Sequence, residues 1–223
     1  MTLPDAMAQR LAAAWVEIYP QLQVKPISFD PEQGRLVVEC SNHAYFTQVR
    51  LIGGQLVKRI NEAIGEPVVL TLAYRLRDIR ILVTGSRAWD LPQEVHGALL
   101  EAWHDAIQVH GVAHRIVIVH GACPTGADRD ASEWAQANTS VVEEAHPADW
   151  SAPCPPKCLR GDHRKTSPQH GDYCPMAGPR RNKAMVDRGA DLCLAFIRGG
   201  SRGSAATARL AEAAGIPTRR FTA

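Results

Sequence analysis

From residue 79 onward, short apolar runs of strand length alternate with longer segments of helical periodicity, and this alternation constrains the fold more than any other feature. Strand–helix alternation predicts parallel strands that are covered by helices on both faces. The chain is therefore expected to contain an α/β domain built on a parallel sheet. The predicted strands are 79–84, 115–120, 141–144, 192–197 and 218–221, and the predicted helices are 93–109, 126–138, 179–189 and 203–214.

Three of the predicted strands end in glycine-rich loops. Glycine lets the backbone approach a ligand closely, serine and arginine donate hydrogen bonds to phosphate, and a helix N-terminus attracts an anion. A single Gly-Gly pair is often only a tight turn. Three such loops at the carboxyl edge of one sheet, where ligands of such sheets bind, predict a ligand site. The candidate ligand-binding residues in these loops are Gly85, Ser86, Arg87, His120, Gly121, Thr125, Gly126, Asp128, Gly199, Gly200, Ser201, Gly203 and Ser204.

Charged residues near these loops extend the predicted site. Asp128 is well placed to accept a hydrogen bond from a ribose hydroxyl, or to cap the helix that it opens. Arg180, Arg181 and Asn182 open another helix, where cations are disfavoured unless an anion lies nearby. We therefore expect these three residues to bind the ligand, with a solvated basic helix end as the alternative.

The tryptophans of this region divide into two kinds. Trp103 and Trp134 fall on predicted helices and are expected to pack in the core. Trp89 and Trp150 lie in loops near the predicted site, where an indole can stack on a base. Packing within the fold is the main expectation for this second pair, and base stacking is the alternative.

Residues 151–176 form an insert in which helical and strand patterns vanish and cysteine and histidine gather. Three cysteines and one histidine make a closed tetrahedral set for a structural zinc ion, with no open position for catalysis. His163 and His170 compete for the fourth position, and His163 is preferred because it lies nearer the first two cysteines. A reduced loop with incidental cysteines is the alternative. The predicted zinc ligands are Cys154, Cys158, His163 and Cys174.

The first third of the chain has a different pattern, in the order helix, strand, helix, strand. The expected elements are a helix at 4–19, a strand at 35–40, a helix that Ser41-Asn42 caps and Gly65 ends, and a strand at 68–77. The pattern changes at Asp78. We therefore predict a small α+β domain at 1–77 and the α/β domain, with the insert, at 78–223.

The second domain resembles the SLOG superfamily in its YspA-like branch, which is related to the DprA and LOG proteins. The resemblance rests on four segments, which are Val83–Arg87, His120–Asp128, Ala177–Asn182 and Gly199–Ser204. It implies a Rossmann-like fold that binds a nucleotide or a nucleotide-derived signal.

The LOG branch of that superfamily splits a nucleoside monophosphate into free base and ribose phosphate, and it places a glutamate just after its glycine loop. The corresponding stretch here, 203–209, holds no acidic residue. The resemblance therefore favours binding over hydrolysis, and no catalytic residue is assigned. A LOG-like phosphoribohydrolase and a DprA-like factor that binds single-stranded DNA stay open as alternatives.

The first domain resembles the DciA-like domain, a small KH-like fold. The matching features are Trp15, Gly34–Val38 before Ser41, Ala44–Phe46 and Thr71–Arg75, although His43-Ala44-Tyr45 replaces the usual tryptophan after the serine. This resemblance implies contacts with DNA or with a replicative helicase.

Composition and charge place few further limits on the function of the chain. The formal net charge of +2 gives no global argument for nucleic acid or a membrane surface. The apolar runs are too short to span a bilayer, and no secretion signal is recognisable, so we expect a cytoplasmic protein without membrane partners and with reduced cysteines. A homo-oligomer stays open.

Overall fold

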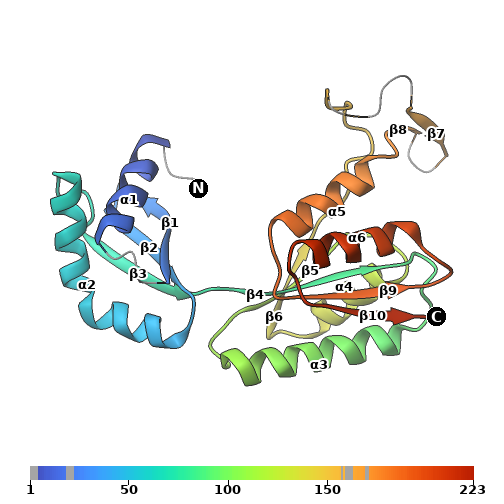
Figure 1. The fold of residues 1–223 in the computed structure, drawn as a ribbon, viewed down its shortest axis with the longest axis horizontal. Coiled ribbons are helices and arrows are strands. Elements are labelled where there is room, and N and C mark those ends of the chain that lie inside the picture. Colours follow the sequence, from blue (N-terminus) through green and yellow to red (C-terminus); the bar gives the residue numbers. More distant parts are fainter. Residues whose placement is uncertain (1–4, 19–22, 157, 159–162, 169–170) are drawn as a thin grey trace. The chain divides into compact units, whose positions relative to one another are not determined.

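The computed structural model describes residues 5–18, 23–156, 158, 163–168 and 171–223. The chain divides into two compact units, unit 1 at residues 1–77 and unit 2 at residues 78–223 (Figure 1). His170, the alternative fourth zinc ligand, lies outside the described residues.

Unit 1 is a three-stranded sheet with two helices. Its elements are α1 (Asp5–Ile18), β1 (Val24–Asp30), β2 (Arg35–Cys40), α2 (His43–Ile64) and β3 (Thr71–Leu76). The sheet order is β1-β2-β3, with β1 antiparallel and β3 parallel to β2. The expected order of helix, strand, helix, strand is therefore wrong by one strand, because β1 was not predicted. Pro26 lacks an amide hydrogen and the register shifts between Pro26 and Ser28, so β1 carries a weak strand pattern.

Local sequence signals set the bounds of α2 as predicted. The side chain of Asn42 accepts a hydrogen bond from the amide of Tyr45, and Gly65 ends the helix at a φ of 81°. The tryptophan of α1 is fixed within the core of this unit, because its indole nitrogen donates to the carbonyl of Val24 over 2.8 Å. Sequence alone therefore places the longest helix of unit 1 correctly.

Unit 2 contains the predicted parallel sheet, whose five strands run in the order β10-β9-β4-β5-β6. The strands are β4 (Ile79–Gly85), β5 (Ile116–His120), β6 (Val141–Ala145), β9 (Leu192–Ile197) and β10 (Thr218–Thr222), and the helices are α3 (Pro92–His110), α4 (Ala127–Ala137), α5 (Ala177–Asp187) and α6 (Arg202–Ala213). The insert also holds a short hairpin of β7 (Lys165–Ser167) and β8 (Gly171–Tyr173), which was not predicted because three-residue strands leave no periodic signal.

Helices cover both faces of this sheet, as the alternation predicts (Figure 1). Ile81 and Val83 of β4 pack with α3 and α4, whereas the intervening Leu82 packs with residues of α5 and α6. Trp134 is buried in the first of these cores, as expected. Trp89 is also buried there, 2% exposed and edge-on to Phe196, so it is a core residue and not a stacking platform.

Candidate functional site

A cavity of about 540 Å³ lies at the carboxyl edge of the sheet in unit 2, where β4, β5 and β9 end. Its walls come from the three glycine loops and from the first turns of α5 and α6. Ten of the predicted ligand-binding residues line it, namely Gly85, Ser86, Arg87, Gly121, Asp128, Arg181, Asn182, Ser201, Gly203 and Ser204. Lining residues outside the predicted set are Cys123, Gly178, Arg198 and Thr207, among others, and Trp150, which the sequence places near the site, also lines the cavity.

The other six predicted residues do not line the cavity, namely His120, Thr125, Gly126, Arg180, Gly199 and Gly200. Gly199 and Gly200 are exposed, with φ values of 57° and 66°, and they turn the chain between β9 and α6. The backbone conformation therefore accounts for glycine at both positions.

Ser86 ties the first loop to the third. Its hydroxyl donates to the carbonyl of Arg198 over 3.2 Å and accepts from the amide of the same residue over 2.8 Å. The hydroxyl proton is thus engaged within the protein, although a phosphate donor was the expectation. Gly126 has a related role, because a Cβ there would lie 2.9 Å from Arg87 Cα, so that glycine lets the second loop pack on the first.

His120 is also a loop-positioning residue. It is 1% exposed, its Nε2 lies 2.9 Å from Glu143 Oε1, and its Nδ1 accepts from the amide of Ala122 over 3.1 Å. Both ring nitrogens are engaged by the protein, and His120 does not line the cavity.

Asp128 and Arg181 form the charged centre of the cavity. The carboxylate is 7% exposed and accepts from the amide of Cys123 over 3.2 Å, and the guanidinium donates to the carbonyl of His146 over 2.8 Å. Burial is the main cause that raises the pKa of Asp128 and lowers that of Arg181, and the charge of each group opposes the shift of the other. The Nε of Arg181 is buried with no hydrogen-bond partner among the described residues.

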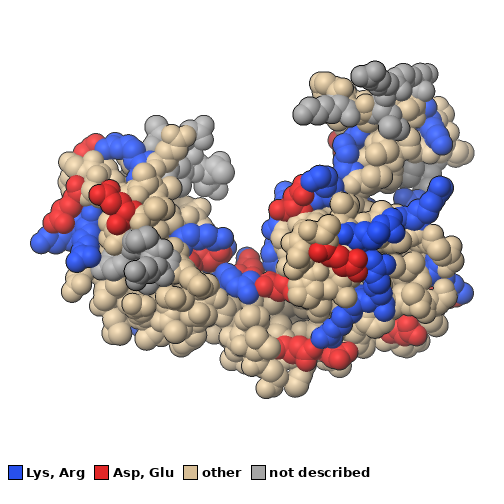
Figure 2. Space-filling view, viewed as in Figure 1, with Lys and Arg blue, Asp and Glu red and all other residues tan. Residues whose placement is uncertain are grey.

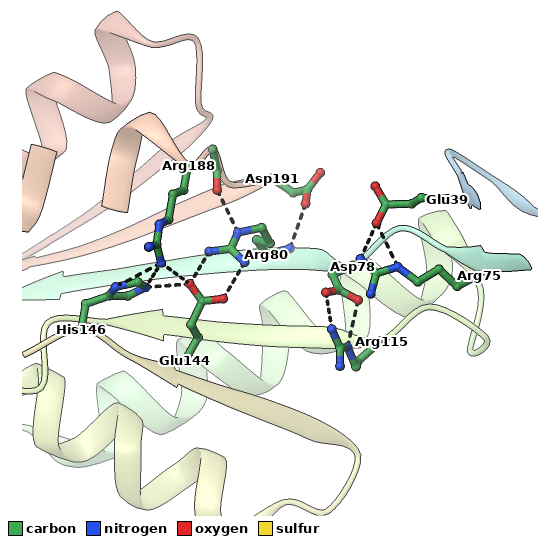
Figure 3. A network of polar contacts seen from close by, with 10 residues as sticks. Glu39, Arg75, Asp78, Arg80, Arg115, Glu144, His146, Arg188 and Asp191 are labelled. Carbon is green, nitrogen blue, oxygen red and sulfur yellow. Dashed lines mark hydrogen bonds and ion pairs between the residues drawn. The ribbon is translucent and has the colours of Figure 1, made fainter. Parts of the chain in front are cut away.

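A polar network holds the segment to which Arg181 donates (Figure 3). Arg80 of β4 forms a two-pronged ion pair with Glu144 of β6 over 2.7 and 2.8 Å. The side chain of His146 lies 2.6 Å from Glu144, and Arg188, just after α5, contacts both. Hydrogen bonding to Arg80 is the main cause that lowers the pKa of Glu144 to about 2. The carbonyl that accepts from Arg181 is thus held by an ionised network beneath the cavity.

The start of α6 lines the cavity with Gly203 and Ser204. The hydroxyl of Ser201, at the N-cap position, pairs with the hydroxyl of Ser204 over 3.1 Å and makes no capping hydrogen bond to a backbone amide. Asn182 of α5 is bound to the second turn of α6, because its amide nitrogen donates to Thr207 Oγ1 over 2.7 Å. An uncapped helix N-terminus beside arginine side chains is suited to an anion.

The insert brings Cys154, Cys158, His163 and Cys174 together in a cluster that could hold a metal ion. His163 Nε2 lies 3.3, 3.2 and 3.4 Å from the three sulfur atoms, and the sulfurs of Cys158 and Cys174 are 3.7 Å apart. A tetrahedral zinc ion with ordinary bond lengths has sulfur–sulfur edges of about 3.8 Å and sulfur–nitrogen edges of about 3.5 Å. The donor set fits that geometry.

Arg180 lies at this cluster and not at the cavity. Its Nη1 donates to the sulfurs of Cys158 and Cys174 over 3.3 and 3.4 Å, and Arg164 donates to the sulfur of Cys154 over 3.7 Å. The prediction that Arg180 lies in the ligand site is therefore corrected, because its side chain leaves α5 toward the sulfur atoms.

Comparisons with known proteins agree with this architecture. The Gene 61 protein of Mycobacterium phage D29 is 36% identical to this chain over 146 residues, which make up 64% of the chain and 95% of the phage protein. The chain belongs to the same family as this phage protein. Residues 79–152 match the YspA, cpYpsA-related SLOG family, and residues 4–73 match DciA, the Dna[CI] antecedent.

The matched stretch of the SLOG family is shorter than the resemblance suggested, because it ends before the metal cluster, α5 and α6. No solved structure matches the chain. Within the described residues, no helix combines the length and apolar character needed to cross a membrane.

Proposed function

We propose that unit 2 binds a phosphorylated nucleoside or a nucleotide-derived signal in the cavity at the carboxyl edge of its sheet. The observation that carries this proposal is the charge of the lining residues. Arg87, Arg181 and Arg198 line one cavity, and Asp128 is the sole carboxylate among the described residues that line it, although Arg198 also pairs with Asp90 outside the cavity. A volume of about 540 Å³ is within the ordinary range for small-molecule sites.

Different walls of the cavity suit different parts of such a ligand. The amides at the start of α6 and the nearby arginines suit a phosphate group. The carboxylate of Asp128 suits the hydroxyls of a ribose. Trp150 lines the cavity with the guanidinium of Arg87 5.9 Å from its ring centre, and its indole offers an apolar face for a base.

We propose binding without hydrolysis. Cleavage of a glycosidic bond needs a carboxylate that can reach the developing positive charge on the ribose. Asp128 lies beside Arg181, so its negative charge is already offset by the guanidinium and is less available to stabilise a positive charge on the ribose. This arrangement supports a recognition role for Asp128.

The test is a melting-temperature shift of the full chain with AMP, ADP-ribose and inorganic phosphate. A ligand at one hundred times its dissociation constant stabilises the protein by about 2.7 kcal/mol, which is a shift of roughly 5–10 °C for a chain of this size. Arg181→Ala is expected to abolish the shift. Arg209→Ala removes an exposed arginine of α6 that does not line the cavity, so it is the matched control. Release of free adenine from AMP would contradict the proposal and favour a LOG-like hydrolase.

We propose that the cysteine–histidine cluster holds a structural zinc ion. Four protein ligands leave no open coordination position for a reacting water molecule. Elemental analysis of purified protein is expected to give about one zinc per chain. Retention of that stoichiometry in Cys174→Ser would argue against the assigned ligand set.

We propose that unit 1 contacts DNA or a replicative helicase, on the strength of its match to DciA. Arg50, Lys58 and Arg59 are exposed on α2, but acidic and basic side chains are interspersed over the face of this unit that Figure 2 shows. Contact of three cations with single-stranded DNA predicts a slope of about −2 for log affinity against log salt. Fluorescence anisotropy of a labelled oligonucleotide across a salt series measures that slope. Absence of binding at low salt would remove DNA as the partner.

A further inference from the structure

The metal cluster and one wall of the cavity are built from the same short stretch of chain. Cys174 precedes α5 by three residues, its amide donates to the carbonyl of Trp150 over 3.0 Å, and its carbonyl accepts from the amide of Ala177 over 3.0 Å. Trp150 lines the cavity, and its ring lies against Gly178, where a Cβ would be 3.0 Å from the indole. A metal ligand is thus hydrogen-bonded through the backbone to a residue of the cavity wall.

Two neighbouring arginines of α5 contact the metal cluster and the cavity, one each. Arg180 donates to the sulfurs of Cys158 and Cys174, and Arg181 lines the cavity and donates to the carbonyl of His146. The start of α5 is therefore held by the cluster on one side, and on the other side it places the side chain of Arg181 in the cavity. Any movement of this turn relative to the cluster would move the guanidinium in the cavity.

The insert has little else to hold it in place. Among its described residues within 151–176, Cys174 alone is buried, and its hairpin has strands of three residues. Apolar burial supplies most of the free energy that orders a segment, so a segment with one buried residue depends on another source. Metal binding can supply it, because the free energy of binding at such a site is also free energy of folding.

We infer that metal bound at Cys154, Cys158, His163 and Cys174 orders the first turn of α5, so that metal occupancy sets the affinity of the cavity for its ligand. Arg180 is the positioning residue between the two, since its hydrogen bonds join the helix to the cluster. Linkage is reciprocal, so a bound ligand also raises the affinity of the cluster for its metal. The statement about ligand affinity rests on the proposed ligand-binding function, whereas the ordering of α5 rests only on the proposed metal site.

Hydrogen exchange of the full chain, measured without any ligand, tests the ordering. Zinc-loaded protein and protein stripped with a chelator are compared at the amides of residues 180–186, and the helix at 92–110 is the internal reference. We expect exchange at 180–186 to be at least about tenfold faster after stripping, with the reference unchanged. Equal exchange at 180–186 in the two forms would overturn the inference.

Variants separate positioning from metal binding. Arg180→Ala is expected to keep one metal per chain, to shift the thiolate-to-metal absorption of the cobalt-substituted protein, and to speed exchange at 180–186. Lys183→Ala, which removes an exposed side chain paired with Asp187 on the same helix, is the control. It is expected to leave both the cobalt absorption and the exchange at 180–186 unchanged. An Arg180→Ala protein with the absorption and exchange of the parent would show that this arginine has no positioning role.

Titration calorimetry with AMP as the probe then tests the effect on affinity. We expect stripping to weaken AMP binding at least about tenfold. Equal AMP affinity in loaded and stripped protein would overturn the coupling and leave the proposed function intact. If AMP binds neither form, the proposed function fails for this probe, and the exchange data alone decide whether the metal orders α5.

Discussion

Replacement of Gly121 by alanine tests the centre of the candidate site most directly. A Cβ at this position would lie less than 3.0 Å from the guanidinium of Arg181 and 2.6 Å from Asp128 Oδ2. Real Cβ atoms essentially never make contacts that short, so the guanidinium must leave its place above the second glycine loop. Its hydrogen bond to the carbonyl of His146 would be lost at the same time.

The expected cost follows from these contacts. The guanidinium ends a flexible side chain and can move into the adjoining cavity, so the main cost is the lost hydrogen bond; loss of a hydrogen bond from a charged group costs about 1.5–3 kcal/mol. We therefore expect unit 2 of Gly121→Ala to be less stable by about 1.5–3 kcal/mol. Asp128 would also lose its nearest cation, so its pKa would rise further.

Urea unfolding measures the change in stability, and the melting-temperature shift with AMP measures the change in the site. Gly97→Ala is the matched control, because this glycine is exposed on α3 and a Cβ there meets nothing within 4 Å. The control is expected to gain up to about 1 kcal/mol from its higher helix propensity. A Gly121→Ala protein as stable as the parent, with an unchanged AMP shift, would refute the assignment of Arg181 to the cavity.

Three further predictions concern stability. The ion pair with Arg80 lowers the pKa of Glu144 from 4.5 to about 2, so the pair stabilises the protein above pH 4.5 and this stabilisation is lost as the pH falls towards 2. Urea unfolding midpoints measured from pH 2 to 6 should therefore fall with decreasing pH in the parent protein, and Arg80→Met should reduce this fall. Trp15→Phe removes the indole donor to Val24, and we expect a loss of about 1–2 kcal/mol in unit 1, read by urea unfolding; no change would mean that the bond is not formed in solution. Asn42→Ala removes the N-cap of α2, and a loss of about 1 kcal/mol is expected in the same assay, whereas Asn42→Ser should restore most of it.

Much of the fold could be predicted from the sequence because its signals are local. Apolar runs of strand length, helical periodicity and the cap at Asn42 each depend on residues close together in the chain. The parallel sheet of unit 2 follows from the order of those signals. The strand around Pro26 was missed because its pairing with β2, and not its own pattern, makes it a strand.

The candidate site was less predictable, because the role of a side chain depends on distant partners. Ser86 reads as a phosphate donor until Arg198, 112 residues away in sequence, is found to engage its hydroxyl. Arg180 and Arg181 are adjacent and chemically identical, and only the direction in which each side chain leaves α5 separates a role at the metal cluster from one in the cavity. The metal ligands were easier to predict, because their donor atoms crowd into one short stretch of chain that has no apolar core of its own.

The strand order of unit 2 has a consequence for how such a protein can diversify. The strand β6 lies at an edge of the sheet, and the chain must travel from its end to α5, on the opposite face from α4, before it returns to β9. That crossover begins at the carboxyl edge, beside the cavity. Extra residues added there reach the mouth of the cavity without interrupting any strand, so insertions of different length could retune ligand choice while the sheet stays the same.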